Sequence, residues 1–118
     1  MANPNILNIN TIRGKTLFGE VTTSASTFMT NSANSGELIK INSLIAINKG
    51  GDQADITIKI SKSGTLYFLA NAITVPTNSN LVLLTRDMQW YLEETDYIQA
   101  FCNVASTLTL ACSYESIL

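Results

Sequence analysis

The chain has 118 residues, enough for one domain with its own hydrophobic core and too few for two of ordinary size. Charged residues make up 14% of it, the net charge at pH 7 is −2, and histidine is absent. This balance disfavours nucleic-acid binding, and the lack of histidine excludes Ser-His-Asp and Cys-His catalysis and the most common transition-metal ligand. Ser, Thr and Asn together supply 37 residues, a composition that favours strands and turns.

The N-terminal residues 1–14 are rich in Asn and lack the basic flank and apolar core of a signal peptide. No window of the chain is apolar enough for a membrane span. We therefore expect a protein made in a cytoplasm, with residues 1–14 as an N-terminal arm and residues 15–118 as the folded domain.

Strand patterns begin directly after this arm. Residues 16–30 are expected to hold one or two strands, and residues 31–36 form a polar loop. Residues 37–48 are a long β-branched run that ends at the turn sequence Lys-Gly-Gly-Asp.

The clearest strand covers residues 55–62, where polar and apolar residues alternate strictly. This alternation predicts three isoleucines on a buried face, with Thr57 and Ser61 among the residues of a solvated face. A turn at residues 62–65 leads into residues 66–70, which predicts a hairpin.

The C-terminal half holds further short strands, and no stretch has a sustained helical period. An apolar run at residues 81–84 is typical of a strand covered on both faces. About eight strands predict an all-β, antiparallel β-sandwich with either jelly-roll or Ig-like strand order. The remaining predicted strands are residues 73–75, 89–92, 97–104 and 107–114.

Cys102 and Cys112 fall on the inward faces of the last two strands, which we expect to be antiparallel neighbours. A turn at Ala105 and Ser106 would place the two cysteines out of direct register. The sequence therefore favours buried free cysteines over a disulfide, and the absence of Cys-x-x-Cys argues against redox catalysis.

The acidic cluster Glu93, Glu94 and Asp96, with Asp87 nearby, fits neither an EF-hand nor a glycosidase cleft, so we interpret it as a hairpin turn. No nucleophile motif or phosphate-binding loop is present. We expect no catalytic residue, no metal site and no cofactor.

The aromatic residues Tyr67, Phe68, Trp90 and Tyr91 could form a platform for sugars or bases, although adjacent strand residues usually point to opposite faces. Aromatic side chains are also common in subunit interfaces. Our candidate interface residues are Ile6, Leu7, Ile9, Ile12, Arg13, Tyr67, Trp90 and Tyr91.

Residues 38–118 contain a series of short motifs, each of which occurs once and in a characteristic order. It comprises LIAIN at 44–48, ADITIK at 54–59, LYFLA at 66–70, VP at 75–76, LVLL at 81–84, YLEETD at 91–96 and SYESI at 113–117, with a fainter echo at 11–16. This series resembles a family of small structural proteins of tailed phages, especially those of cyanobacteria and other marine hosts. Members of that family often have Gly where this chain has Thr95, so the chain departs from the pattern at this turn.

The resemblance implies a non-enzymatic virion component made in the bacterial host cytoplasm, and it does not separate the capsid shell from the neck or tail. We expect a late protein that decorates or cements the capsid by bridging its subunits, thereby stabilising the phage head. Its partners would be further copies of itself, most simply as a homotrimer, and the major capsid protein or other virion subunits. The N-terminal arm would lie across a neighbouring subunit.

Two alternatives to capsid decoration stay open. A neck or tail accessory subunit would share the same composition and fold. A carbohydrate-binding module for host attachment would need an exposed Trp90–Tyr91 surface. Neither nucleic acid nor a membrane is expected as a partner.

Overall fold

A computed structural model of the chain describes residues 11–85, 87 and 90–118, which form nine strands and contain no helix. No helix able to cross a membrane is therefore found among them. The strands are β1 (Ile12–Val21), β2 (Ser26–Thr30), β3 (Leu38–Asn48), β4 (Ala54–Lys62), β5 (Thr65–Val75), β6 (Asn80–Leu84), β7 (Trp90–Leu92), β8 (Tyr97–Cys102) and β9 (Leu108–Ile117).

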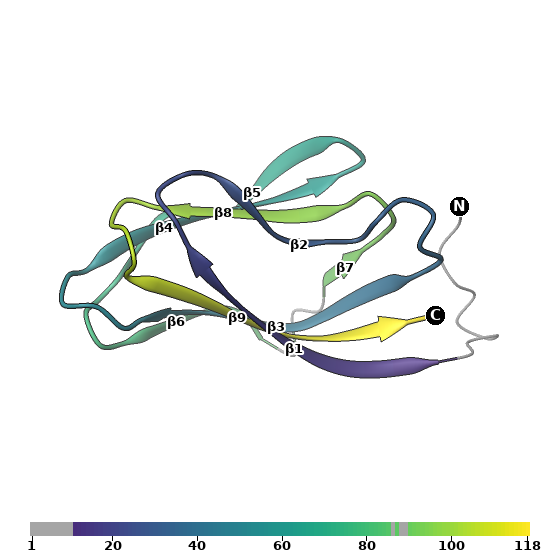
Figure 1. The fold of residues 1–118 in the computed structure, drawn as a ribbon, viewed down its shortest axis with the longest axis horizontal. Coiled ribbons are helices and arrows are strands. Elements are labelled where there is room, and N and C mark those ends of the chain that lie inside the picture. The colour runs from purple at the N-terminus through teal and green to yellow at the C-terminus, as the bar shows by residue number, and fades with distance from the viewer. Residues whose placement is uncertain (1–10, 86, 88–89) are drawn as a thin grey trace.

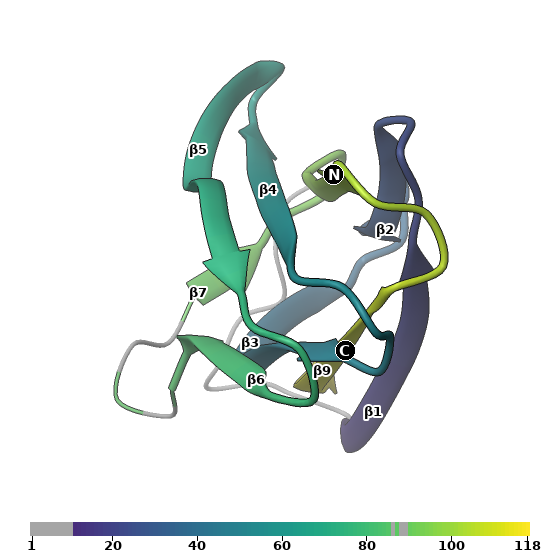
Figure 2. The same ribbon diagram turned by 90° about the vertical axis from the view of Figure 1, so that its left-hand side faces the viewer.

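The strands form two antiparallel sheets that pack face to face (Figures 1 and 2). Sheet A has the order β1-β9-β3-β6, with the short β7 also paired to β3, and sheet B has the order β2-β8-β4-β5. The predicted all-β sandwich is confirmed. Without β7, the eight remaining strands form two four-stranded sheets in the strand order of a jelly roll. The short β7 is an addition to this arrangement.

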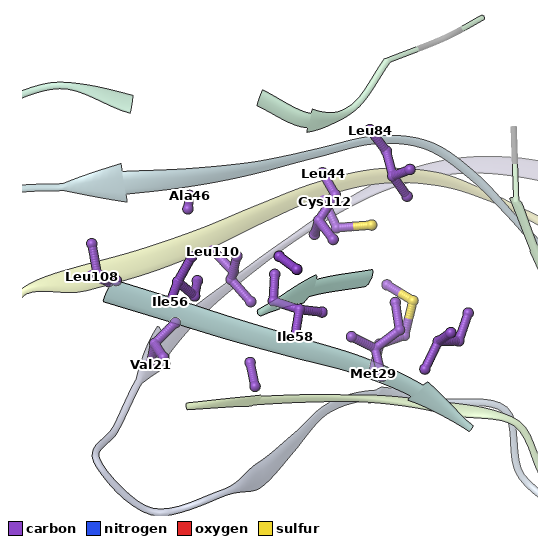
Figure 3. Close-up of a cluster of buried hydrophobic side chains, with 14 of the residues drawn as sticks. Val21, Met29, Leu44, Ala46, Ile56, Ile58, Leu84, Leu108, Leu110 and Cys112 are labelled. Atoms are coloured by element: carbon purple, nitrogen blue, oxygen red, sulfur yellow. The ribbon is translucent and has the colours of Figure 1, made fainter. Parts of the chain in front are cut away.

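The core lies between the two sheets and is built from the inward faces of their strands. Ile56 and Ile58 of β4 point from sheet B towards Leu44, Leu110 and the other buried side chains of sheet A (Figure 3). The isoleucine face predicted for residues 55–62 is therefore confirmed, since its members are buried. Burial of such branched side chains contributes most of the stability of a domain of this size.

Two strand predictions were wrong in detail. Residues 66–70 and 73–75 belong to one strand, β5, because bulges and the left-handed conformation of Ala72 (φ 51°) keep the chain in the sheet. The run at residues 81–84 is not covered on both faces. It forms β6, an edge strand, and Val82 is 50% exposed on the outer face of sheet A.

The outer face of β4 is also less solvated than the alternation predicts. Thr57 and Ser61 are both buried. The hydroxyl of Thr57 accepts a hydrogen bond of 3.1 Å from the backbone N–H of Ala72, where β5 bulges, which supplies the polar partner that a buried hydroxyl needs. Ser61 lies between Leu66 of β5 and Tyr97 of β8 in the sheet.

The last two long strands do not form the expected hairpin. β8 belongs to sheet B and β9 to sheet A, so the chain crosses between the sheets after Cys102. Cys102 and Cys112 consequently lie on opposite sheets, and both are free and buried, as the sequence predicted.

The start of β1 overlaps the expected arm. Residues 12–14 pair with Ile117, Ser116 and Glu115 of β9, and the backbone of Thr11 exchanges two hydrogen bonds with that of Leu118. The rest of the arm, residues 1–10, lies outside the described residues.

Candidate interaction surface

The predicted interface residues fall in separate parts of the molecule. Ile12 and Arg13 are exposed at the start of β1, on one edge of sheet A. Trp90 and Tyr91 lie in β7, on the other side of β3. Tyr67 lies in β5, on an edge of sheet B. The three remaining residues, Ile6, Leu7 and Ile9, are outside the described residues.

Trp90 and Tyr91 help to line a shallow groove of about 430 Å³ between β4 and β7. Tyr67 pairs opposite Ile60, a groove residue, and is 56% exposed. The structure therefore brings these three predicted aromatic residues to the neighbourhood of one groove. Among the described residues, the lining consists of Ile60, Lys62, Trp90, Tyr91 and Glu93.

The two aromatic residues of β7 do not form a flat platform. Trp90 pairs opposite Ile41, a core residue, whereas Tyr91 pairs opposite Lys40. Residues directly opposite in a sheet share a face, so Trp90 faces the interior and Tyr91 faces outward. This separation disfavours stacking of a sugar ring on both side chains together.

An ion pair beside the groove fixes the turn after β7. Asp96 is only 2% exposed, and its Oδ2 accepts hydrogen bonds from Lys62 Nζ at 2.6 Å and from the backbone N–H of Glu93 at 2.9 Å. Its Oδ1 accepts from the N–H of Ser63 at 3.2 Å. Lys62 Nζ also donates to the carbonyl of Tyr91 at 3.0 Å. These bonds tie β4, β7 and the turn together, and the charge of Lys62 is neutralised by a buried partner.

The acidic cluster lies at a turn, as the sequence predicted, but this turn does not belong to a hairpin, because β7 is in sheet A and β8 is in sheet B, and Asp96 is buried. Residues 94–95 form the turn, and Thr95 has a φ of 74°. Within the described part of the chain, no three His, Cys, Asp or Glu residues are grouped to hold a metal ion.

An apolar row on the outer face of sheet A was not predicted from the sequence. In this row, Phe18, Ala111, Ile45 and Val82 are successive partners on β1, β9, β3 and β6. Phe18 is 65% exposed at one end and Val82 is 50% exposed at the other. Each strand shows its own alternation in the sequence, but only the pairing register shows that these four residues are neighbours.

The outer face of sheet B carries exposed apolar residues as well. Leu66 and Phe68 of β5 are exposed there. The ammonium group of Lys59 lies 4.9 Å from the centre of the Phe68 ring, a cation–π contact that covers part of this ring.

The cysteines offer no nucleophile. Burial raises the pKa of the Cys112 thiol to about 12, so the thiolate needed for nucleophilic or redox chemistry is not formed at neutral pH. Cys102 is buried as well, and its Sγ lies 3.1 Å from the carbonyl oxygen of Val104.

Comparison with known proteins finds no protein family and no curated protein that matches the chain. Among solved structures, a protein of Bacillus endospore appendages, described as a novel family of disulfide-linked pili, matches with a TM-score of 0.51 and 14% identity, over 91% of this chain and 85% of that chain. Two structures of a pentameric capsid protein isolated from metagenomic phage sequences match with TM-scores of 0.45 and 0.44 and 17% identity, over 83% of this chain and 60% and 59% of theirs. The first likeness shows a shared fold alone, and the other two carry no argument at these TM-scores.

Proposed function

We propose that this chain is a non-enzymatic structural protein of a phage virion, and that it decorates or cements the capsid. The observation that carries the proposal is the row Phe18, Ala111, Ile45 and Val82, which places an apolar side chain on the outer face of each of the strands β1, β9, β3 and β6. Extended apolar surface of this kind is typical of protein–protein contacts, whereas enzymes and small-ligand sites are typically concave.

The sequence motifs over residues 38–118 support the same role through their resemblance to small phage structural proteins. The endospore appendage protein, which shares the fold, belongs to disulfide-linked pili, and so gives an example of this fold in an assembly. In the present chain both cysteines are buried, so we propose that association is non-covalent. Homotrimers on the threefold positions of the shell are the stoichiometry we propose.

The test uses capsids of the phage that encodes the chain, stripped of the protein and incubated with the purified full-length chain. Saturable co-sedimentation with the shell, together with a higher temperature of DNA release, is the expected result. Failure to bind shells under any condition would overturn the proposal. Labelled protein located only at the neck or tail by electron microscopy would support the accessory-subunit alternative instead.

The carbohydrate-binding alternative has its own readout. Trp90 is the only tryptophan and lines the groove beside β4, so a sugar bound there would change its fluorescence. Titration with the host's surface glycans should leave Trp90 emission unchanged if the protein is a capsid component alone.

The proposed contact of the arm is tested by deleting residues 1–10, which leaves the pairing of β1 with β9 intact. We expect the truncated chain to fold but to lose capsid binding. Shells saturated by the truncated chain would show that the arm is not needed.

A further inference from the structure

The strands at the edges of the two sheets differ in their regularity. β2, β5 and β6 each carry at least one extra residue relative to the neighbouring strand, so a bulge interrupts each of these edges. β1 pairs with β9 from Ile12 to Val21 without a register shift. No described strand pairs with the other side of β1, which lies across the molecule from β5 (Figure 2).

This difference matters because a regular edge strand presents a row of unpaired backbone N–H and C=O groups, which can pair with another chain. Bulges twist an edge away from such pairing. Among the edges described, β1 is therefore the one whose length and regularity suit the addition of another strand.

We propose that β1 is a self-pairing edge, through which two copies of this chain join antiparallel about a two-fold axis. Sheet A would then continue from one copy into the other. This contact needs only a second copy and does not depend on the proposed capsid role. It is compatible with trimers on a shell, because neighbouring threefold positions are related by two-fold axes.

The charges of β1 favour a second β1 that runs antiparallel. Arg13 and Lys15 lie in its first half and Glu20 in its second half. Antiparallel pairing keeps the basic half of one copy away from the basic half of the other, whereas parallel pairing would place the basic halves together. Glu20 does not neutralise them, because it pairs with Lys49 of its own chain. Lysine and arginine usually protect an edge by repulsion, and this repulsion is smallest in the antiparallel arrangement.

The side chains of β1 match best when the two-fold axis passes at Leu17. Thr16 then lies opposite Phe18 of the second copy, so a small side chain faces a ring that is 65% exposed in the single chain. Gly14 lies opposite Glu20 of the second copy, and this long side chain has room because a Cβ atom at Gly14 would meet nothing within 4 Å. An axis at Lys15 would instead place two like charges directly opposite each other.

The apolar row on sheet A supports the same position of the two-fold axis. The row ends at Phe18, on the free edge. With the axis at Leu17, the two Phe18 residues are diagonal neighbours on the same face, within reach of aromatic side chains. The rows of the two copies would therefore join, and Phe18, the most exposed member of each, would be covered.

The test is disulfide trapping in the full-length protein. Residues opposite each other in an antiparallel pair have Cα atoms about 4.5–5.5 Å apart, within the range of a disulfide. Leu17→Cys should therefore give a covalent dimer on mild oxidation, about tenfold faster or more than the control Lys15→Cys, whose two copies would be about 13 Å apart along the strands. The wild-type chain should not cross-link, because Cys102 and Cys112 are buried.

A second pair of variants guards against misfolding, since Leu17 packs partly on the core. Thr16 and Phe18 are exposed, so Thr16→Cys and Phe18→Cys should fold, and a mixture of the two should form the mixed dimer in preference to either homodimer. Light scattering of the wild-type chain across a concentration series should show an even number of copies. A monomer at every concentration, or a dimer whose Leu17→Cys and mixed variants do not cross-link, would overturn the proposal.

Discussion

Thr95 holds a backbone conformation that β-branched residues rarely adopt. Its φ is 74°, in the left-handed region, and its N–H donates to the carbonyl of Asn31 at 2.8 Å. The phage structural proteins that the sequence resembles often have glycine at this position. The backbone at Thr95 therefore has a left-handed conformation that glycine adopts without strain. The β-branched side chain of threonine makes this conformation strained.

Thr95→Gly should raise the free energy of unfolding by about 1 kcal/mol, because relief of the left-handed strain exceeds the extra freedom that glycine gives the unfolded chain. Denaturant unfolding of the two proteins measures the difference. The control is Thr77→Gly in the loop before β6, where φ is not positive and we expect a loss of about 0.5 kcal/mol. Equal effects at both positions would contradict the prediction.

The thiol of Cys112 should make stability fall at high pH. Burial raises its pKa from 9.0 to about 12. Between these values the unfolded chain loses a proton that the folded chain keeps, so the free energy of unfolding falls by up to about 1.4 kcal/mol per pH unit. Below pH 9.0 both states hold the proton and this contribution is fully present.

The measurement compares the pH dependence of unfolding above pH 9 in the wild type and in Cys112→Ala, which should have a shallower slope. Slopes are compared because the smaller side chain also leaves a cavity that lowers stability at every pH. Tyr114 contributes to both slopes, since burial and then the charges of Glu37 and Cys112 raise its pKa. Identical slopes would show that Cys112 is not the group responsible.

At the scale of elements, the sequence predicts best those features that depend only on the residues of one strand. Strand β4 was predicted because strict alternation places Ile56, Ile58 and Ile60 on one face, and this face is buried whichever strands lie beside it. The two cysteines were placed inward by the same pattern. The β8–β9 hairpin was predicted wrongly because a short connection between two strands does not tell whether the chain stays in one sheet or crosses to the other.

The bulges of β5 were missed for a related reason. Nothing in the local pattern of residues 66–75 shows that Ala72 adopts a positive φ, since this conformation is held by the hydrogen bond from its N–H to Thr57 on the neighbouring strand. A conformation that depends on a partner distant in sequence leaves little trace in the residue that adopts it.

The packing of Phe28 of β2 against β1 depends on the absence of a side chain at Gly19. A Cβ atom there would lie 2.9 Å from two ring carbons of Phe28, whereas a Cβ atom at Gly14 would meet nothing within 4 Å. Gly19→Ala should therefore lower the free energy of unfolding by about 1–2 kcal/mol, because the ring must move out of a packed position. Gly14→Ala, on the same strand, should leave it unchanged or slightly higher. Thermal unfolding of both variants tests this, and similar losses in the two would argue against the close contact.

At the scale of the whole molecule, the candidate interaction surface depends on pairing between distant segments. Tyr67, Trp90 and Tyr91 were chosen for their residue types, and the fold brings them near one groove but turns Trp90 and Tyr91 to opposite faces. The apolar row was not predicted at all, because Phe18 and Val82 lie in strands that pair with different neighbours. Its four members become adjacent only once the register of three strand pairs is known.

The row also indicates which face of the sandwich should contact the capsid. It spans all four long strands of sheet A, whereas on sheet B the ring of Phe68 is already partly covered by Lys59. Val82→Lys would place an ammonium group in the proposed contact, where its desolvation costs binding free energy. Since Val82 is half exposed and distant from β1, neither folding nor β1 pairing should change.

We expect Val82→Lys to weaken capsid binding about tenfold or more, which corresponds to about 1.4 kcal/mol, with an unchanged unfolding temperature. Phe68→Lys, which adds the same charge at an exposed position on the opposite face, should bind like the wild type. Co-sedimentation with stripped capsids over a range of protein concentrations gives both affinities. If Phe68→Lys weakens binding and Val82→Lys does not, then sheet B faces the shell, and the row on sheet A is left for contacts between copies.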